Sequence, residues 1–174
     1  MQMEIAPRCF ARLKTKRRTL AGATGCKLCG IESLAALKFN GVLILHKKRQ
    51  GSLKANTVLK AIAALPLLQP HNAVTGSLHA AAWATPDGQL TAVLEDVGRH
   101  NALDKLIGTI GLPQRGFAVM SSRASVELVR KCVQLKISAL ATISAPTFLA
   151  ISLAQRRNLQ LRAMCRPPTA VRYN

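Results

Sequence analysis

The sequence predicts an α/β fold in which a largely parallel β-sheet is covered by helices. The chain has 174 residues, which is most simply one domain with a buried core. Apolar residues make up 49% of it, a share that excludes a disordered chain. In the second half, short apolar runs alternate with helical patterns of about ten residues, and this alternation is typical of βαβ units.

The first half is predicted to contain two helices. After a basic start, the segment CGIESLAALKF places Ile31, Leu34 and Leu37 on one helical face. Residues 40–53 join a short apolar run to a basic stretch with Gly and Ser, so we expect a loop there. The segment ANTVLKAIAALPLL predicts the second helix, with Pro66 near its end.

The second half is predicted to begin with a β-hairpin and to continue as alternating helices and strands. The apolar runs LHAAAWA and LTAVLED flank the turn signal TPDGQ. The pattern then predicts a helix in NALDKLIGTI that Asn101 caps, a strand in FAVMSS, a helix in ASVELVRKCVQL, a strand in ISALATIS, a helix in TFLAISLAQR and a strand in LQLRAMC. Binding sites in such sheets collect at the carboxyl ends of strands, where SSRAS, SAPT and MCRPPT fall.

The chain carries an extreme positive charge. It has 25 Lys and Arg against 7 Asp and Glu, a formal net charge of +18. Such a charge attracts polyanions: nucleic acid, anionic lipid, an acidic protein or a phosphorylated cofactor. We expect no nucleic acid, because stacking aromatics in a basic strand, zinc-finger spacing and a heptad seam are missing from the sequence. We expect no membrane span, because the uncharged stretch 137–154 contains a proline and several hydroxyl residues.

The cysteines do not form a disulfide framework. They number five, at positions 9, 26, 29, 132 and 165, and an odd, sparse set does not suit such a scaffold. The start MQMEIAPRCF has no apolar signal core, so we expect a cytoplasmic protein. Cys132 falls in an apolar helical pattern and is predicted to be buried.

The segment TGCKLCG contains the strongest candidates for chemistry, Cys26 and Cys29. A lysine separates them and the basic run RLKTKRR precedes them, and cations favour the reactive thiolate. This spacing also permits thiol exchange within the pair. A zinc site completed by Cys9, His79 or His100 stays open, although no second close-spaced pair is present. A thioredoxin-like motif is a weaker alternative, because no strand leads into the pair.

Three further segments offer polar side chains. Four of the seven acidic residues cluster in the second half: Glu95, Asp96, Asp104 and Glu127. In so basic a chain this predicts local pairing with Arg99, Lys105 or Arg123, or else a role for His100 as a proton handler.

The segment HAAAW has Ala81 where the zinc nucleobase deaminases carry a glutamate, so we reject deaminase chemistry and expect His79 to be a core histidine. SSRAS, from Ser121 to Ser125, suits a phosphate through its hydroxyls, its guanidinium and the helix N–H groups that follow. Helix capping explains its serines equally well.

Taken together, these motifs resemble the FdhD family, the formate dehydrogenase accessory sulfurtransferases. The resemblance covers most of the chain from Arg17 onward, and it rests on RRTLAGATGCKLCGIESL, TGSLHAAAW, EDVGRHNALDK, SSRASVELVRK, SAPTFLA and MCRPPTAVRYN. The chain has almost none of the N-terminal portion that usually precedes the CxxC pair in this family. The resemblance implies a cytidine-deaminase-like mixed sheet with helices on both faces, preceded by a basic CxxC-bearing segment. Residues 1–53 would form that segment and its linker, and residues 54–174 the α/β sulfurtransferase domain.

The resemblance also implies a sulfur relay. Members accept persulfide sulfur from a cysteine desulfurase and pass it to the molybdenum cofactor, a bis-molybdopterin guanine dinucleotide, for formate dehydrogenase. Cys26 matches the persulfide-bearing cysteine and Cys29 its neighbour. The segment assigned to cofactor binding matches Met164, Cys165, Arg166, Pro167, Pro168 and Thr169, and we expect Ser122 and Arg123 to hold phosphate.

The expected partners are therefore the desulfurase, formate dehydrogenase and the guanine-nucleotide-containing cofactor, which binds transiently as a substrate. We expect no metal and no permanently bound cofactor, and the sequence leaves a homodimer open. Two alternatives to the relay also stay open. One is a zinc-stabilised, non-catalytic module that binds nucleic acid or protein. The other is a decayed, truncated copy without activity.

Overall fold

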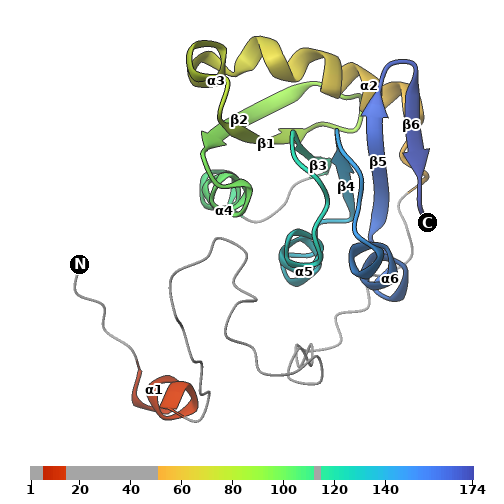
Figure 1. Ribbon diagram of the computed structural model, residues 1–174. Coiled ribbons are helices and arrows are strands. Elements are labelled where there is room, and N and C mark those ends of the chain that lie inside the picture. Colours follow the sequence, from red (N-terminus) through yellow and green to blue (C-terminus); the bar gives the residue numbers. More distant parts are fainter. Residues whose placement is uncertain (1–5, 15–50, 112–114) are drawn as a thin grey trace. The chain divides into compact units, whose positions relative to one another are not determined.

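The structure is a computed structural model that describes residues 6–14, 51–111 and 115–174 (Figure 1). The chain divides into two compact units, Met1–Asn40 and Gly41–Asn174. Helix α1 (Pro7–Lys14) belongs to the first unit and all other elements named below belong to the second. The thiols of TGCKLCG, the helix expected after them and most of the loop expected at 40–53 lie outside the described residues. The predicted boundary at residue 53 stays a prediction.

Six strands of the second unit form one mixed sheet in the order β2-β1-β3-β4-β5-β6. The strands are β1 (His79–Ala84), β2 (Leu90–Asp96), β3 (Phe117–Met120), β4 (Ala139–Thr142), β5 (Gln160–Arg166) and β6 (Thr169–Arg172). The central β3, β4 and β5 are parallel, whereas β1 is antiparallel to both β2 and β3, and β6 is antiparallel to β5. The prediction of a largely parallel sheet is therefore wrong. The mixed sheet is confirmed, and the likeness to cytidine deaminases stays a prediction.

The predicted β1–β2 hairpin is confirmed, and its turn explains the glycine of TPDGQ. Gly88 has a φ of +86°, in the left-handed region that favours glycine. A Cβ atom at this position would also lie 2.5 Å from the backbone oxygen of Thr57. The turn thus needs glycine both for its conformation and for the close approach of helix α2 (Ala55–Ala64), which comes before the hairpin in the chain.

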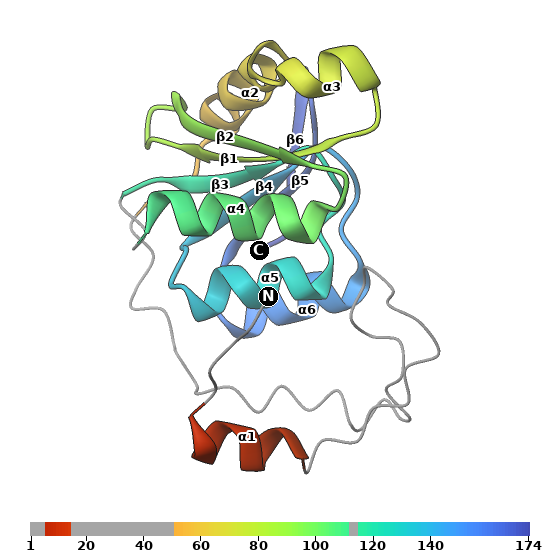
Figure 2. The same ribbon diagram turned by 90° about the vertical axis from the view of Figure 1, so that its left-hand side faces the viewer.

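Helices cover both faces of the sheet, as expected (Figure 2). On one face lie α4 (Arg99–Ile110), α5 (Val126–Gln134) and α6 (Phe148–Arg156). On the other face lie α2 (Ala55–Ala64), the 3-10 turn η2 (Leu65–Leu68) and α3 (Pro70–Thr75). The predicted cap of α4 is wrong. The helix begins at Arg99 with Gly98 as its N-cap, so Asn101 lies inside its first turn.

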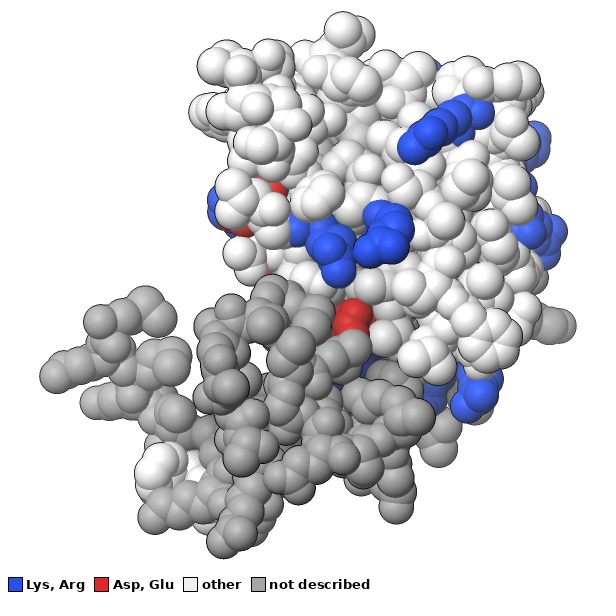
Figure 3. All heavy atoms as spheres, viewed as in Figure 1, with Lys and Arg blue, Asp and Glu red and all other residues white. Residues whose placement is uncertain are grey.

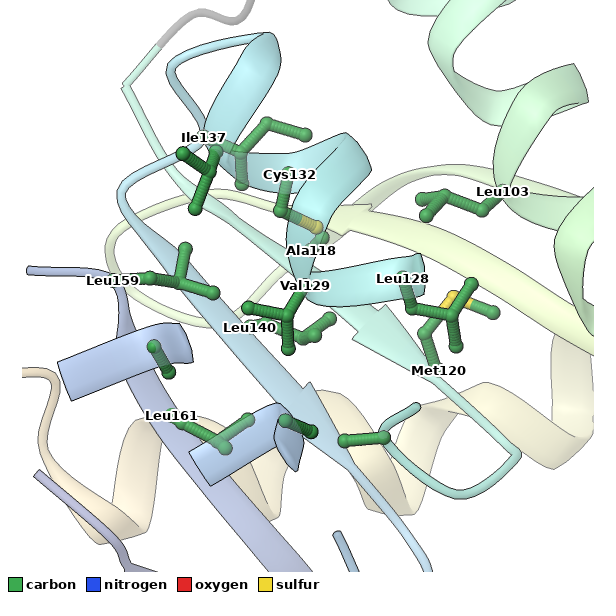
Figure 4. Packing of buried hydrophobic residues seen from close by; sticks show 14 of the residues in the cluster. Leu103, Ala118, Met120, Leu128, Val129, Cys132, Ile137, Leu140, Leu159 and Leu161 are labelled. Carbon is green, nitrogen blue, oxygen red and sulfur yellow. The ribbon is translucent and has the colours of Figure 1, made fainter. Parts of the chain in front are cut away.

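The core consists of one apolar cluster on each face of the sheet. Strand β3 contributes to both, because Ala118 and Met120 face α5 while Phe117 and Val119 face the opposite side. This two-sided burial explains why the strand is a continuous apolar run rather than an alternating one. Figure 4 shows Cys132 of α5 among the leucines of the first cluster, which confirms its predicted burial.

Candidate functional site

Three loops meet at the carboxyl ends of the parallel strands β3, β4 and β5. Residues 121–125 follow β3, residues 143–147 follow β4, and residues 164–169 span the end of β5 and its turn into β6. The first two loops run side by side, because Thr147 N donates to Ala124 O over 3.0 Å. The third joins them through Met164 N, which donates to Ser144 O over 3.3 Å. The structure thus brings SSRAS, SAPT and MCRPPT to one edge, as the strand pattern predicts.

The serines of the first loop have different environments. Ser121 ties the loop to β1, since its Oγ accepts from Ala80 N over 2.8 Å. Ser122 is buried, and its Oγ donates to Arg123 O over 3.2 Å. The side chain of Arg123 is exposed and makes no ion pair with the described carboxylates. Of the two residues expected to hold phosphate, Arg123 alone presents its side chain to solvent.

The first turn of α5 lacks the cap that helix α6 has. Thr147, the N-cap of α6, accepts a hydrogen bond from Ala150 N over 3.2 Å. Ser125, the N-cap of α5, makes no such bond, so capping does not explain this serine. Glu127, in the same turn, is also buried. The Oγ of Ser125 and the Oε1 of Glu127 are both shielded from solvent without a hydrogen-bond partner.

The acidic cluster forms part of the ion-pair network predicted at the corner between β2 and α4. Asp96 pairs with Lys105 over 2.7 Å, and Asp104 pairs with Lys131 over 2.6 Å. Glu95 instead accepts from two backbone N–H groups at the start of α3, those of residues 71 and 72. The predicted pairing with Arg99 or Arg123 is not found among the described residues, and Glu127 has no ion pair there.

The two histidines of interest differ in burial. His79, at the start of β1, is partly exposed, so its predicted place in the core is wrong. Burial and then the charge of Arg99 lower the pKa of His79 below its usual value. His100 is buried in the first turn of α4. No group of three His, Cys, Asp or Glu side chains able to hold a metal occurs in the described part of the chain. A zinc site that uses the thiol pair lies outside that part.

Both described cysteine side chains are held as neutral thiols. Burial raises the pKa of Cys132 to about 12 and that of Cys165 to about 11. Because the thiolate is the nucleophile, neither side chain is reactive at neutral pH. The side chain of Cys165 packs in the core, so only its backbone remains to meet a cofactor. Its neighbour Met164 is exposed.

Met164 stands at an irregular point of the sheet. Its φ is +53°, a left-handed conformation that is unfavourable for a residue with a Cβ atom. The register of β5 against β6 shifts between Ala163 and Arg166, and this shift turns the strand at the candidate edge. Arg166 and residues 167–169 are all exposed. The segment expected to bind cofactor therefore forms an accessible hairpin turn.

The sequence pattern does not point to Phe148, and it predicts an ion pair for Glu127 and either phosphate binding or helix capping for Ser125. Phe148, the first residue of α6, is 81% exposed beside the loop that carries Thr147. An acidic residue inside the apolar pattern ASVELV was the available signal for Glu127.

The basic surface is visible in Figure 3, where Lys and Arg side chains stand among uncharged residues with little acidic surface between them. None of the described helices is long and apolar enough to cross a membrane.

Comparisons with known proteins converge on one family. The model of the FdhD/NarQ family matches residues 1–174. Proteins named sulfur carrier protein FdhD from Acinetobacter baylyi and Chromobacterium violaceum are 49% and 48% identical to this chain, over 178 and 177 residues. The matches take in 100% and 99% of this chain but 64% and 66% of the relatives, so the chain spans just under two thirds of their length.

A solved structure from Desulfotalea psychrophila, whose name describes a formate dehydrogenase accessory protein, is also similar. It superposes with a TM-score of 0.64 at 28% sequence identity. The match covers 69% of this chain and 55% of that chain. The shared fold thus extends over most of the unit that carries the three loops.

Proposed function

Because this chain belongs to the FdhD/NarQ family, we propose that it is a sulfur carrier that supports formate dehydrogenase. It accepts persulfide sulfur from a cysteine desulfurase and passes it to the molybdenum cofactor, bis-molybdopterin guanine dinucleotide, as its substrate. One observation supports this assignment most directly. The two described thiols, Cys132 and Cys165, are buried and protonated, which leaves Cys9 and the CxxC pair for sulfur chemistry. Of these, the pair Cys26 and Cys29 has the spacing that permits thiol exchange.

The first step is a thiol exchange that needs no outside oxidant or reductant. The thiolate of Cys26 attacks the outer sulfur of the desulfurase persulfide. The sulfur–sulfur bond of that persulfide breaks, and the desulfurase cysteine leaves as a thiolate. Cys26 then carries the extra sulfur, and the surrounding positive charge stabilises its anionic form. Cys29 supports the exchange as a neighbouring thiol.

The cofactor binds at the edge where the three loops meet. The exposed guanidinium groups of Arg123 and Arg166 suit its phosphates, because Arg binds phosphate oxygens through paired hydrogen bonds. The open first turn of α5 adds backbone N–H groups and the positive end of a helix dipole. The exposed side chains of Met164 and Thr169 lie in the same hairpin turn as Arg166.

Mass spectrometry tests the sulfur step. The purified chain is incubated with a cysteine desulfurase and cysteine, and is then weighed intact without reductant. We expect a gain of about 32 Da that reductant removes, since a persulfide is a reducible covalent intermediate. The adduct should be absent from Cys26→Ala and retained by Cys132→Ala, the matched control. No adduct on cooperatively folded protein would refute the sulfur-carrier proposal.

A further inference from the structure

Strand β2 is an open edge of the sheet. It pairs with β1 on one side, and no described strand pairs with its other side. None of its residues is fully buried, whereas every residue of β3 and β4 is. Figure 2 looks onto this edge, with α3 above β2 and α4 below it. Alternate residues of β2 therefore turn their backbone N–H and C=O groups outward, where another strand can pair with them.

The opposite edge of the sheet is protected, and β2 is not. Folded proteins protect edges with short strands, basic residues, prolines and bulges. Strand β6 is four residues long, contains Arg172 and follows two prolines. Strand β2 has seven residues without Lys, Arg or Pro, and its one register shift, at Thr91, leaves residues 92–96 in regular pairing. This regular segment is the part of β2 that can accept a further strand.

Apolar side chains flank this edge on both faces of the sheet. The 3-10 turn η2 packs on β2, and there Leu67 is 86% and Leu68 46% exposed. On the other face, Ile107 and Ile110 of α4 are only partly buried against the core. Val97, directly after β2, is 73% exposed. A strand added here would cover apolar side chains on both faces, so a matching strand is itself apolar on both faces.

The surface around β2 lacks the positive charge of the rest of the chain. No Lys or Arg occurs in residues 61–98, although the chain has 25 of them. The acidic residues of this range have partners within the structure, in the ion pairs of Asp87 and Asp96 and in the bonds of Glu95 to the backbone of α3. The upper left of Figure 3, where α3 lies, accordingly shows uncharged residues. A strand that docks here meets no unpaired charge from residues 61–98.

The charge of the whole chain selects the kind of partner. At +18 the chain attracts an acidic protein over a long range and repels a second copy of itself. A lipid surface fits poorly, because segments that bind in the lipid interface carry Lys and Arg beside their apolar side chains, and residues 61–98 have none. The partner that matches both the charge and the edge is an acidic protein with an extended apolar segment.

We propose that the outer side of β2 is a docking site for an acidic protein, which adds an apolar segment as a further strand of the sheet. The added strand pairs with the backbone of residues 92–96 and packs on the apolar side chains of η2 and α4. Backbone pairing supplies the affinity, and the flanking side chains supply the selectivity. This interaction surface goes beyond the proposed function, because it uses neither the thiol pair nor the three loops.

Amide hydrogen exchange of the full chain, measured by NMR, tests the open edge and its occupation. The probe is a synthetic peptide with five alternating valine and isoleucine residues between two pairs of glutamates, since these apolar residues favour strands. In the chain alone, we expect the outward amides of residues 92–96 to exchange about a hundredfold faster than those of β3 and β4. A saturating concentration of the peptide should slow them about tenfold or more.

Two altered peptides separate strand pairing from charge. A peptide with proline at its centre should not bind, because proline interrupts the backbone pairing. A peptide with lysines in place of the glutamates should bind about tenfold or more weakly at low salt, because the chain repels it. Equal binding of the glutamate and lysine peptides would overturn the acidic partner, and equal binding of the proline peptide would overturn strand addition.

A matched pair of variants locates the site. Leu67→Ser should weaken the glutamate peptide about tenfold, because it removes an apolar contact from the β2 edge. Val171→Ser changes an exposed apolar residue of the opposite edge strand and should leave the affinity unchanged. Equal effects of the two variants would refute docking at β2.

Two results would assign the edge to another occupant. If the outward amides of residues 92–96 are as protected in the isolated monomer as those of β3, the chain covers its own edge. If sedimentation shows a dimer that Leu67→Ser dissociates, a second copy covers it. Either result overturns the proposal.

Discussion

Asp96, at the end of β2, stabilises the start of α4 as a charged acceptor. Its carboxylate accepts from Lys105 over 2.7 Å, from Gly98 N over 2.8 Å and from the amide of Asn101 over 3.2 Å. The bond to Lys105, followed by that to Gly98, lowers the pKa of Asp96 to about 2. The folded chain therefore binds the proton of this group less readily than the unfolded chain does.

This difference predicts a specific pH dependence of stability. Since the folded pKa lies below the unfolded value of about 3.9, the contribution of Asp96 is complete above that value and is lost as the pH falls toward 2. Urea unfolding of the parent chain and of Asp96→Asn should differ most above about pH 5 and converge near pH 2. Lys105→Met should reduce the same difference. A gap that stays constant with pH would contradict this role of Asp96.

The site residues differ in how visible they are in the sequence. The pair Cys26 and Cys29 stands out because its spacing and its basic surroundings are local properties. The unpaired state of Ser125 and Glu127 is a tertiary property, because it depends on which groups the fold places around them. The clustering of acidic residues predicts local pairing with Arg99, Lys105 or Arg123, and of these Lys105 pairs, with Asp96. It does not predict that Asp104 pairs with Lys131 of α5.

At the scale of elements, the N-terminal caps of α5 and α6 can be compared within the same protein, because both helices have a hydroxyl residue at the N-cap. Thr147 satisfies a backbone N–H of α6, whereas Ser125 satisfies none in α5. Thr147→Ala should lower the free energy of unfolding by about 1 kcal/mol, within the usual range of about 0.5–2 kcal/mol for such caps. Ser125→Ala should leave it nearly unchanged, because no hydrogen bond is lost.

Urea denaturation of both variants checks this prediction. The slope of the transition should match that of the parent chain in each case, since neither change alters the surface exposed on unfolding. An equal loss of stability in the two variants would show that the turn of α5 is capped after all.

Local patterns predict the elements of the second unit better than their pairing. The turn TPDGQ and its apolar flanks are sufficient to predict the β1–β2 hairpin, because both partners are adjacent in the chain. The antiparallel pairing of β1 with β3 joins segments separated by α4, and no local pattern encodes its direction. Helix α3, with six residues, is too short to show a helical period. Strand β6 follows two prolines, which mark a turn but not a return strand.

At the scale of the whole second unit, the two buried thiols lie on opposite faces of one sheet, so the accessibility of each thiol measures whether the core on its own face is intact. Cys132 lies in the apolar cluster under α5, and Cys165 lies in the cluster under α2. If the unit unfolds as one cooperative body, both thiols become accessible together. Their reactivity therefore tests whether the chain has a complete core.

We expect both thiols to resist alkylation in the native chain and to become reactive at the same urea concentration. Peptide mapping after pulsed labelling with iodoacetamide measures each site separately. The masking of Cys132 and Cys165 by burial is the physical reason, since only an exposed thiolate reacts quickly. Two separate midpoints, or labelling without urea, would favour the decayed copy over a functional carrier.

The left-handed backbone conformation of Met164 has a consequence for how this protein would change under selection for stability. Glycine or asparagine adopts that backbone more readily, so replacing the methionine there is expected to raise thermal stability. The same replacement removes an exposed apolar side chain from the edge where the three loops meet. Consensus or directed-evolution campaigns that reward heat resistance alone would therefore select against this exposed methionine. A screen that also measures sulfur transfer is needed to retain the proposed carrier activity.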